Sequence, residues 1–467
     1  MIPSAAISDA MYVLAAVLFI LGIKKVTKVQ TARVGNFFGS IGMLLAIVAT
    51  LLRMQFDGAG IGWLYIGVAA MIGSLIGGLL ARFAKMTAMP QTVALFHSLG
   101  SLAAVLVVLS FEMTAPSSDP FIVFTAWLSI IIGAVAFTGS LVAFGKLQEL
   151  LPGRPILYPG RTIAVGLIAI ATFVVGALVQ MHGASGATGM HLLYMLTGLA
   201  CLLGILLTIS IGGADMPVVI SLLNSYTGLA NATAGFVLGN TALIITGALV
   251  GASGFILTKI MCKAMNRSLV NVIFGGVGAQ KQSSKGSQEY SNLKESSPEE
   301  AALLLDSANS VIVVPGYGFA VAQAQHALKE LFEALGKKGK DVKFAIHPVA
   351  GRMPGHMNVL LAEADVPYDK LYELERINGE FKNTDVVIVV GANDVVNPAA
   401  SQDASSPLFG MPILNAHEAR TVIFIKRGLS PGFAGVKNSL FEADNCRMLF
   451  MDAKEGLQQM AKEFRET

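Results

Sequence analysis

The chain has 467 residues, enough for two or more domains, and only 13% of them are charged. A net charge of +3 without any run of like charges argues against nucleic acid as a partner. Three cysteines, Cys201, Cys262 and Cys446, lie far apart and match no metal-ligand spacing, so we expect packing roles and no metal site. Mean hydropathy is +0.65, and nearly all the apolar excess precedes residue 265.

Nine apolar segments of roughly the length that a membrane-spanning helix needs precede residue 265. Lys and Arg gather in alternate loops, as at Lys24, Arg82, Lys146 and Lys263, whereas the loops between hold only Arg53. Cations favour the cytoplasmic side. We therefore expect an integral membrane protein, in a bacterial inner membrane, with the N-terminus outside and the part after residue 265 in the cytoplasm. A mitochondrial chain would place that part in the matrix. The segments cover approximately residues 7–23, 36–52, 62–83, 92–110, 121–145, 162–180, 190–211, 217–238 and 242–262.

The chain after residue 265 changes character. Residues 278–297 are rich in Gly, Ser, Lys and Gln and predict a flexible linker, and Ser297-Pro298-Glu299-Glu300 then predicts a capped helix start. Short β-branched runs alternate with helical patterns from there on, which predicts a Rossmann-like α/β domain with a doubly wound parallel sheet. We expect a bundle of about nine helices over residues 1–265, a linker over 266–297 and the α/β domain over 298–467. The expected strands are Val311–Val314, Val342–Ile346, Val386–Val390, Val422–Ile425 and Met448–Met451.

The segment Pro315–Gln325 follows the first of these strands with two glycines and then a helix-forming stretch. Gly316 and Gly318 let backbone amides approach a pyrophosphate, and a helix N-terminus favours its charge, so a dinucleotide is expected here. The third position of the motif is Val321, which makes this a variant, and a plain tight turn is the alternative. In parallel sheets, ligands bind beyond the carboxyl ends of the strands. Those ends carry Gly316-Tyr317-Gly318, His347–Arg352, Gly391–Asp394 and Lys426-Arg427.

The strand ends also favour one dinucleotide over the other. NAD sites usually have a carboxylate after the second strand, but this chain has Ile346-His347-Pro348 there. Lys426 and Arg427 supply two adjacent cations at another strand end, and a guanidinium suits phosphate. The pattern favours NADP(H), although such a cation pair can also be a solvated strand end.

Ionisable and polar side chains inside the predicted spans are the candidates for proton transfer. His97 lies within a span, and histidine takes up and releases protons near neutral pH. An inert histidine bonded to Ser101 is the alternative. In the eighth span, Ser221, Asn224, Gly228 and Asn231 share one face, as interhelical hydrogen-bonding groups or as the lining of a water path. Asp215 precedes that span at its inner end.

Several blocks of the sequence closely resemble the β subunits of proton-translocating NAD(P) transhydrogenases, and the resemblance covers essentially the whole chain. It implies that this chain binds NADP(H), that a separate α subunit binds NAD(H), and that hydride passes directly between the nicotinamides while a proton crosses the bilayer. It also implies a dimer of such heteromers in membrane lipid. The blocks are Gly212–Pro217, Leu223–Tyr226, Met261–Arg267, Pro315–Gln325, His347–Ala362, Gly391–Ala400 and Lys426–Val436.

The resemblance also implies residue roles. It assigns His97 and Asn224 to the proton path. Asp215, just before Pro217 at the inner mouth, is well placed to couple that path to the nucleotide domain. The resemblance assigns Arg352 to the cofactor phosphates and Lys426 and Arg427 to the 2′-phosphate. The family often has Tyr at the position of Phe433, so ring packing is retained there but a hydroxyl contact is in doubt. The remaining assignments are Gly316, Tyr317, Gly318 and Val321 to the pyrophosphate loop, Gly391, Asn393 and Asp394 to a loop near the nucleotide, and Gly432, Phe433 and Ala434 to a lid over it.

Two other functions fit parts of the pattern. An ion channel or transporter with a nucleotide-sensing Rossmann domain would explain both halves, but the only Gly-Tyr-Gly of a potassium-filter type lies in the soluble half. An enzyme that uses its helices only as an anchor would not need nine spans or a histidine within one of them.

Overall fold

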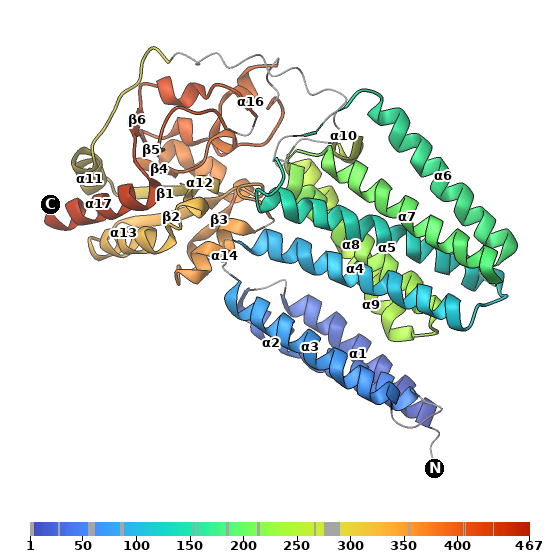
Figure 1. Ribbon diagram of the computed structural model, residues 1–467. Helices are drawn as coiled ribbons and strands as arrows, with labels where there is room; N and C mark the ends of the chain where they lie inside the picture. The colour runs from blue at the N-terminus through green and yellow to red at the C-terminus, as the bar shows by residue number, and fades with distance from the viewer. Residues whose placement is uncertain are drawn as a thin grey trace. The chain divides into compact units, whose positions relative to one another are not determined.

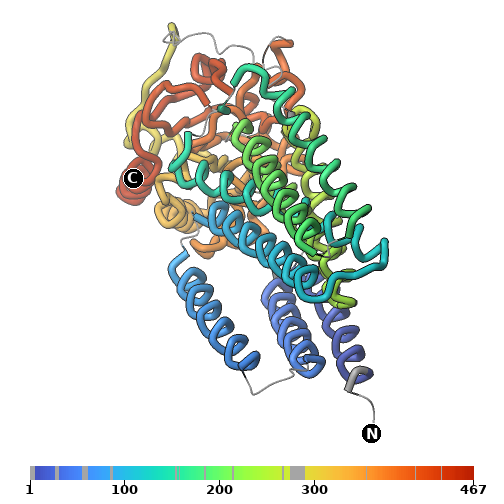
Figure 2. The backbone as a smooth tube through the Cα atoms, turned by 45° about the vertical axis from the view of Figure 1, so that its right-hand side comes forward, coloured from blue at the N-terminus to red at the C-terminus, as the bar shows by residue number. Residues whose placement is uncertain are grey.

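The computed structural model describes residues 4–26, 29–54, 61–84, 88–152, 155–156, 158–183, 186–212, 215–265, 268–274, 290–353, 355–404, 406, 408–432 and 434–467. The chain divides into two compact units, shown in Figures 1 and 2. We call Met1–Ser210 with Ile220–Leu257 the membrane unit and Ile211–Val219 with Thr258–Thr467 the nucleotide unit, after the roles expected of them from the sequence.

A long helix occupies each of the nine predicted spans. Eight of the helices in the described part of the chain are long and apolar enough to cross a membrane. The ninth, α8, does not reach that hydropathy, because Ser, Asn and Thr side chains recur along it. The helices are α1 (Ser4–Val26), α2 (Val29–Arg53), α3 (Ile61–Phe83), α4 (Met89–Thr114), α5 (Pro120–Leu147), α6 (Arg161–His182), α7 (Gly186–Ile209), α8 (Met216–Val237) and α9 (Thr241–Ala264).

Glycines bring α8 and α9 close together. A Cβ added at Gly228 would collide with the backbone of Gly251, and one at Gly254 would collide with the backbone of Ser225. Hydroxyls add hydrogen bonds along the same contact: Ser221 Oγ donates to the Gly254 carbonyl over 3.1 Å and Ser225 Oγ to the Gly251 carbonyl over 2.7 Å. Small residues and interhelical hydrogen bonds therefore stabilise this pair, as expected where lipid removes the hydrophobic driving force.

The nucleotide unit is built on a six-stranded, all-parallel sheet in the order β3-β2-β1-β4-β5-β6 (Figure 1). The predicted doubly wound sheet is confirmed. Its switch point, where the direction of strand order reverses, lies between β1 and β4. Every residue of β4 is buried, as expected for a central strand covered on both faces. The strands are β1 (Ser310–Pro315), β2 (Asp341–Ile346), β3 (Leu371–Glu373), β4 (Val386–Val390), β5 (Thr421–Ile425) and β6 (Cys446–Leu449).

Two strand predictions need correction. The three-residue β3 was not predicted, because it is too short to show an alternating pattern and is recognised only by its pairing with β2. The last strand begins two residues earlier than predicted, because Cys446 pairs with Val422 of β5, and ends at Leu449 rather than Met451.

Helices cover both faces of the sheet. The predicted helix start at Ser297 is confirmed, since its hydroxyl accepts a hydrogen bond from the Glu300 N–H over 3.3 Å. The helix expected after Pro315 is interrupted: α12 is short, Gln323 has a φ of 50°, and a second helix begins at Gln325. The remaining helices are α10 (Leu269–Phe274), α11 (Pro298–Ser307), α12 (Tyr317–Val321), α13 (Gln325–Lys337), α14 (His356–Glu363), α15 (Leu374–Ile377), α16 (Ala399–Gln402) and α17 (Ala453–Glu466).

The end of the predicted linker lies against the sheet. The N–H of Ser296 donates to the Met448 carbonyl over 2.9 Å, and the N–H of Met448 donates to the Lys294 carbonyl over 2.7 Å. These bonds extend the sheet beyond β6 with a short strand-like segment. Residues 275–289, the centre of that predicted linker, lie outside the described residues.

Candidate functional site

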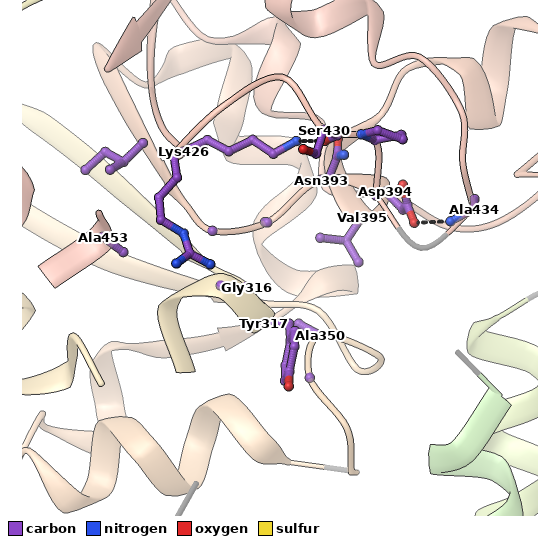
Figure 3. A pocket seen from close by; sticks show the side chains of 18 of the residues that line it. Gly316, Tyr317, Ala350, Asn393, Asp394, Val395, Lys426, Ser430, Ala434 and Ala453 are labelled. Atoms are coloured by element: carbon purple, nitrogen blue, oxygen red, sulfur yellow. Dashed lines mark hydrogen bonds between the residues drawn. The ribbon is translucent and has the colours of Figure 1, made fainter. Parts of the chain in front are cut away.

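A cavity of about 730 Å³ lies at the carboxyl ends of the strands, beside the switch point between β1 and β4 (Figure 3). Loops that follow five different strands line it: Gly316 after β1, Ala350 after β2, Asp394 after β4, Lys426 after β5 and Ala453 after β6. A crevice at this position is where doubly wound sheets bind nucleotides.

The glycines of the first loop are required by the loop beside it. The N–H of Gly316 donates to the Val390 carbonyl over 2.9 Å, and the N–H of Gly318 donates to the Gly391 carbonyl over 2.8 Å. A Cβ at Gly316 would collide with the backbone of Ala392, and Gly391 has a φ of 62°. The two loops therefore lie backbone to backbone. Gly316, Tyr317, Gly318 and Gly391 line the cavity, whereas Val321 is half exposed on α12 and does not.

Arg352 is held from two sides at the edge of the cavity. Its guanidinium lies over the Tyr317 ring, with Cζ 4.5 Å from the ring centre, and its backbone N–H donates to Nδ1 of His356 over 3.1 Å. Burial, followed by the nearby Arg352 charge, lowers the pKa of His356 to about 4, so the imidazole is neutral and can accept that bond. The arrangement fixes a cation where an anionic ligand can reach it.

Lys426 and Arg427 place two further cations at the end of β5. The Lys426 Nζ donates to the Ser430 carbonyl and lies over the Phe441 ring, and burial lowers its pKa although Asp394 partly opposes this (Figure 3). Arg427 is exposed and also lines the cavity. Lys426 is thus positioned by its neighbours, and Arg427 is accessible to a ligand.

The predicted lid segment is attached to the loop after β4. The Ala434 N–H donates to Oδ2 of Asp394 over 2.8 Å, as the dashed line in Figure 3 marks. The side chain of Asn438, which follows the predicted lid, donates to Oδ1 of Asn393 over 2.8 Å. Gly432 and Ala434 line the cavity, and Phe433 lies outside the described residues.

Sequence reasoning missed the residues that support this site. His356 and Asn438 do not line the cavity but hold Arg352 and Asn393, and Asp452 and Ala453 line it from the loop after β6. The strand β6 was predicted, so its carboxyl end could have been added to the site. Nothing in the local sequence singles out His356 or Asn438, because their roles depend on partners brought together by the fold.

The membrane unit joins two of the predicted proton-path residues. The side chain of Asn224 on α8 lies within interaction range of the imidazole of His97 on α4. The alternative in which Ser101 partners His97 is not observed, because the Ser101 hydroxyl bonds to that of Thr227 over 2.8 Å. Asn224 and Thr227 thus reach α4, whereas Ser221 bonds to α9 and Gly228 lies against it. Asp215 lies directly before α8, and its N–H donates to the Gly212 carbonyl over 3.1 Å.

Comparison with known proteins agrees with this arrangement. The family model described as NAD(P) transhydrogenase beta subunit matches residues 8–463. A protein of Rhodospirillum rubrum named NAD(P) transhydrogenase subunit beta is 48% identical over 464 residues, which is 97% of this chain and 98% of that protein. A protein of the same name from a designated strain of that species matches to the same extent. With a membrane unit of apolar helices and a Rossmann-like unit that carries a strand-end cavity, the chain belongs to the NAD(P) transhydrogenase beta-subunit family.

Proposed function

We propose that this chain is the NADP(H)-binding and membrane subunit of a transhydrogenase that couples hydride transfer between NAD(H) and NADP(H) to proton translocation. An α subunit provides the NAD(H) site and is required for activity. The complex, a dimer of heteromers, lies in a bacterial inner membrane with the N-terminus of this chain outside and its nucleotide domain in the cytoplasm. The domain boundaries at residues 265 and 298 are part of this proposal.

The observation that carries NADP(H) binding is the pair of cations at the end of β5, within the cavity beside the switch point. A 2′-phosphate is the group that distinguishes NADP(H) from NAD(H), and adjacent Lys and Arg side chains suit it. The end of β2 supports the same choice. The residue there is His347, which is buried with Nε2 2.7 Å from the Pro412 carbonyl, so no carboxylate is available for ribose hydroxyls at that position.

The cavity suits a dinucleotide in its other parts as well. The closely packed Gly316 and Gly391 loops leave no Cβ at the surface where a pyrophosphate would approach, and Arg352 provides a fixed cation beside them. The lid residues Gly432 and Ala434 cover the site through Asp394. The bound nicotinamide supplies the hydride chemistry, and the protein orients it and excludes water.

The membrane unit supplies the proton-binding group in this proposal. His97 can hold a proton, and Asn224 can orient the imidazole but cannot carry the charge itself. Linkage requires that proton occupancy near His97 and nucleotide affinity change each other equally. One proton moving through 100 mV of membrane potential contributes about 2.3 kcal/mol, which is enough to change a binding constant more than tenfold.

Reconstitution of this chain in liposomes, with and without the α subunit, tests the proposal. We expect hydride transfer between NADH and an NADP⁺ analogue, together with proton movement into the vesicles, only when both subunits are present. Direct transfer by the chain alone, or transfer with no proton movement in sealed vesicles, would contradict it.

A further inference from the structure

Glu112 is a buried ionisable side chain of the membrane unit that has no part in the proposed proton path. Glu112 lies in the last turn of α4, and only 2% of its surface is exposed. Neither carboxylate oxygen has a hydrogen-bond partner among the described residues, and no ion pair of Glu112 is found there.

An ionised carboxylate is very costly in such a place. Removing it from water without partners costs several kcal/mol, and the negative end of the α4 dipole lies within the same turn. A protonated carboxyl avoids both penalties. The side chain is therefore expected to hold a proton at rest, which distinguishes it from the exposed Asp9, whose carboxylate pairs with Arg53 over 3.2 Å.

Glu112 lies in the last turn of α4, and His97 lies in the first half of the same helix. Fifteen residues, or about 22 Å of helix, separate them. Polar side chains surround His97: Ser98 and Ser101 follow it on α4, and Ser101 is hydrogen-bonded to Thr227 of α8. From Ser101 to Glu112 the buried side chains of α4 are Ala104, Val105 and Val108.

This apolar stretch has a consequence for proton movement. His97 Nδ1 is buried and has no hydrogen-bond partner in the described part of the chain, so it can receive a proton. A continuous water path through the apolar stretch would leak protons between the two compartments. A proton-holding group at the far end of this stretch would let a proton cross in stages without a permanently open water path, and Glu112 is in position to be that group.

We propose that Glu112 is a proton-binding site of the membrane unit, which takes a proton from water at the end of the bundle opposite the Lys- and Arg-rich loops and releases it toward His97. This inference rests on the proposed function. The step is a proton transfer only: the carboxylate becomes a carboxylic acid and then a carboxylate again. During the second change, water that enters the apolar stretch transiently carries the proton across the distance between the two groups, and the imidazole of His97 gains it.

Besides the paired Asp9 and Arg53, the ionisable groups that the structure describes near this end of the bundle do not take the same role. The Asp119 carboxylate caps α5 by accepting the Phe121 N–H over 2.8 Å and is exposed. His182 faces the Leu178 carbonyl of its own helix, and His191 at the start of α7 is exposed. Tyr194 of α7 bonds to the Met113 sulfur, 3.7 Å away, and not to Glu112.

The test compares Glu112→Gln, Glu112→Asp and the control Asp119→Ser in the reconstituted complex with its α subunit. Gln keeps the size but cannot release a proton, so we expect at least a tenfold loss of coupled proton movement. Asp should restore part of it. Asp119→Ser removes a carboxylate from the same end, keeps a capping oxygen, and should behave as wild type. Infrared difference spectra should show a protonated-carboxyl band that is absent in Glu112→Gln.

Wild-type proton movement in Glu112→Gln would overturn the inference. Equal losses in the Gln and Asp variants, with no change in the carboxyl band, would also overturn it, because that result indicates a packing role. A wild-type complex that transfers hydride but moves no protons would instead contradict the proposed function.

Discussion

Both units of this chain use glycine to let two backbone segments approach closely, but the consequences differ. In the membrane unit, Gly228 and Gly251 let two straight helices approach, and neither has a positive φ. In the nucleotide unit, Gly391 combines a φ of 62° with contact to the backbone of the neighbouring loop. The membrane unit therefore places a few functional side chains on rigid helices, whereas the nucleotide unit shapes its site largely with loop backbone.

The largest effect should come from a side chain of the membrane unit. We expect His97→Ala to abolish proton movement and to slow coupled turnover by at least a hundredfold, because general acid–base groups contribute about that much. NADP(H) should still bind to the nucleotide unit. Asn224→Ala should act in the same direction but more weakly, because it removes only a neighbouring polar group and leaves the imidazole in place.

Protons moved per hydride transferred in sealed vesicles is the decisive measurement for that pair. An unchanged ratio in His97→Ala would show that the histidine has a packing role and that the proton path lies elsewhere.

In the nucleotide unit, the methyl group added by Gly391→Ala should impair folding and nucleotide binding nearly as strongly. Gly391→Ala combines an unfavourable φ with a backbone collision, so we expect a loss of about 3 kcal/mol or more in the free energy of unfolding, together with weaker nucleotide binding. Gly336→Ala is the matched control. It lies in α13 with nothing within 4 Å of the added Cβ, and should stabilise the unit by about 0.5–1 kcal/mol. Denaturant unfolding of residues 290–467 would compare the two, and equal effects would refute the backbone argument.

Removal of a cationic side chain in the nucleotide unit should have a smaller effect, and one that is selective for NADP(H). Arg427→Ala should weaken NADP(H) binding about 10- to 100-fold, the range expected for a charge-assisted hydrogen bond, and should leave the weaker NAD(H) binding nearly unchanged. Calorimetry with both nucleotides measures the difference. Equal losses for the two would assign Arg427 a structural role instead of recognition of the 2′-phosphate.

The mildest expected effect at neutral pH is a pH dependence of the nucleotide unit, because it develops only on acidification. Burial lowers the pKa of both His347 and His356 from 6.5 to about 4. Between pH 6.5 and 4 the unfolded chain therefore binds more protons than the folded one, so stability should fall on acidification across that window. Each histidine should contribute roughly 1–3 kcal/mol. His356→Gln should flatten the dependence, and a variant that keeps the wild-type slope would contradict this origin.

The sequence by itself determined the division into apolar helices and a parallel-sheet domain, because residue composition and hydrophobic period are local properties. The nine spans, the strands β1, β2, β4 and β5, and the N-cap at Ser297 follow from such patterns. The glycine loop and the cations at the end of β5 were also recognisable, since residue type and position after a strand identify them.

Only the tertiary structure decided which side chains meet. The β3 strand exists through its pairing with β2, and α12 ends where Gln323 adopts a positive φ. The partner of His97 is Asn224, 127 positions along the sequence, whereas the nearer Ser101 bonds to Thr227. His356 and Asn438 hold cavity-lining residues in place through hydrogen bonds that no local sequence pattern encodes. Local sequence sets the conformation of each element, but the partners of a buried polar group depend on which elements pack against it.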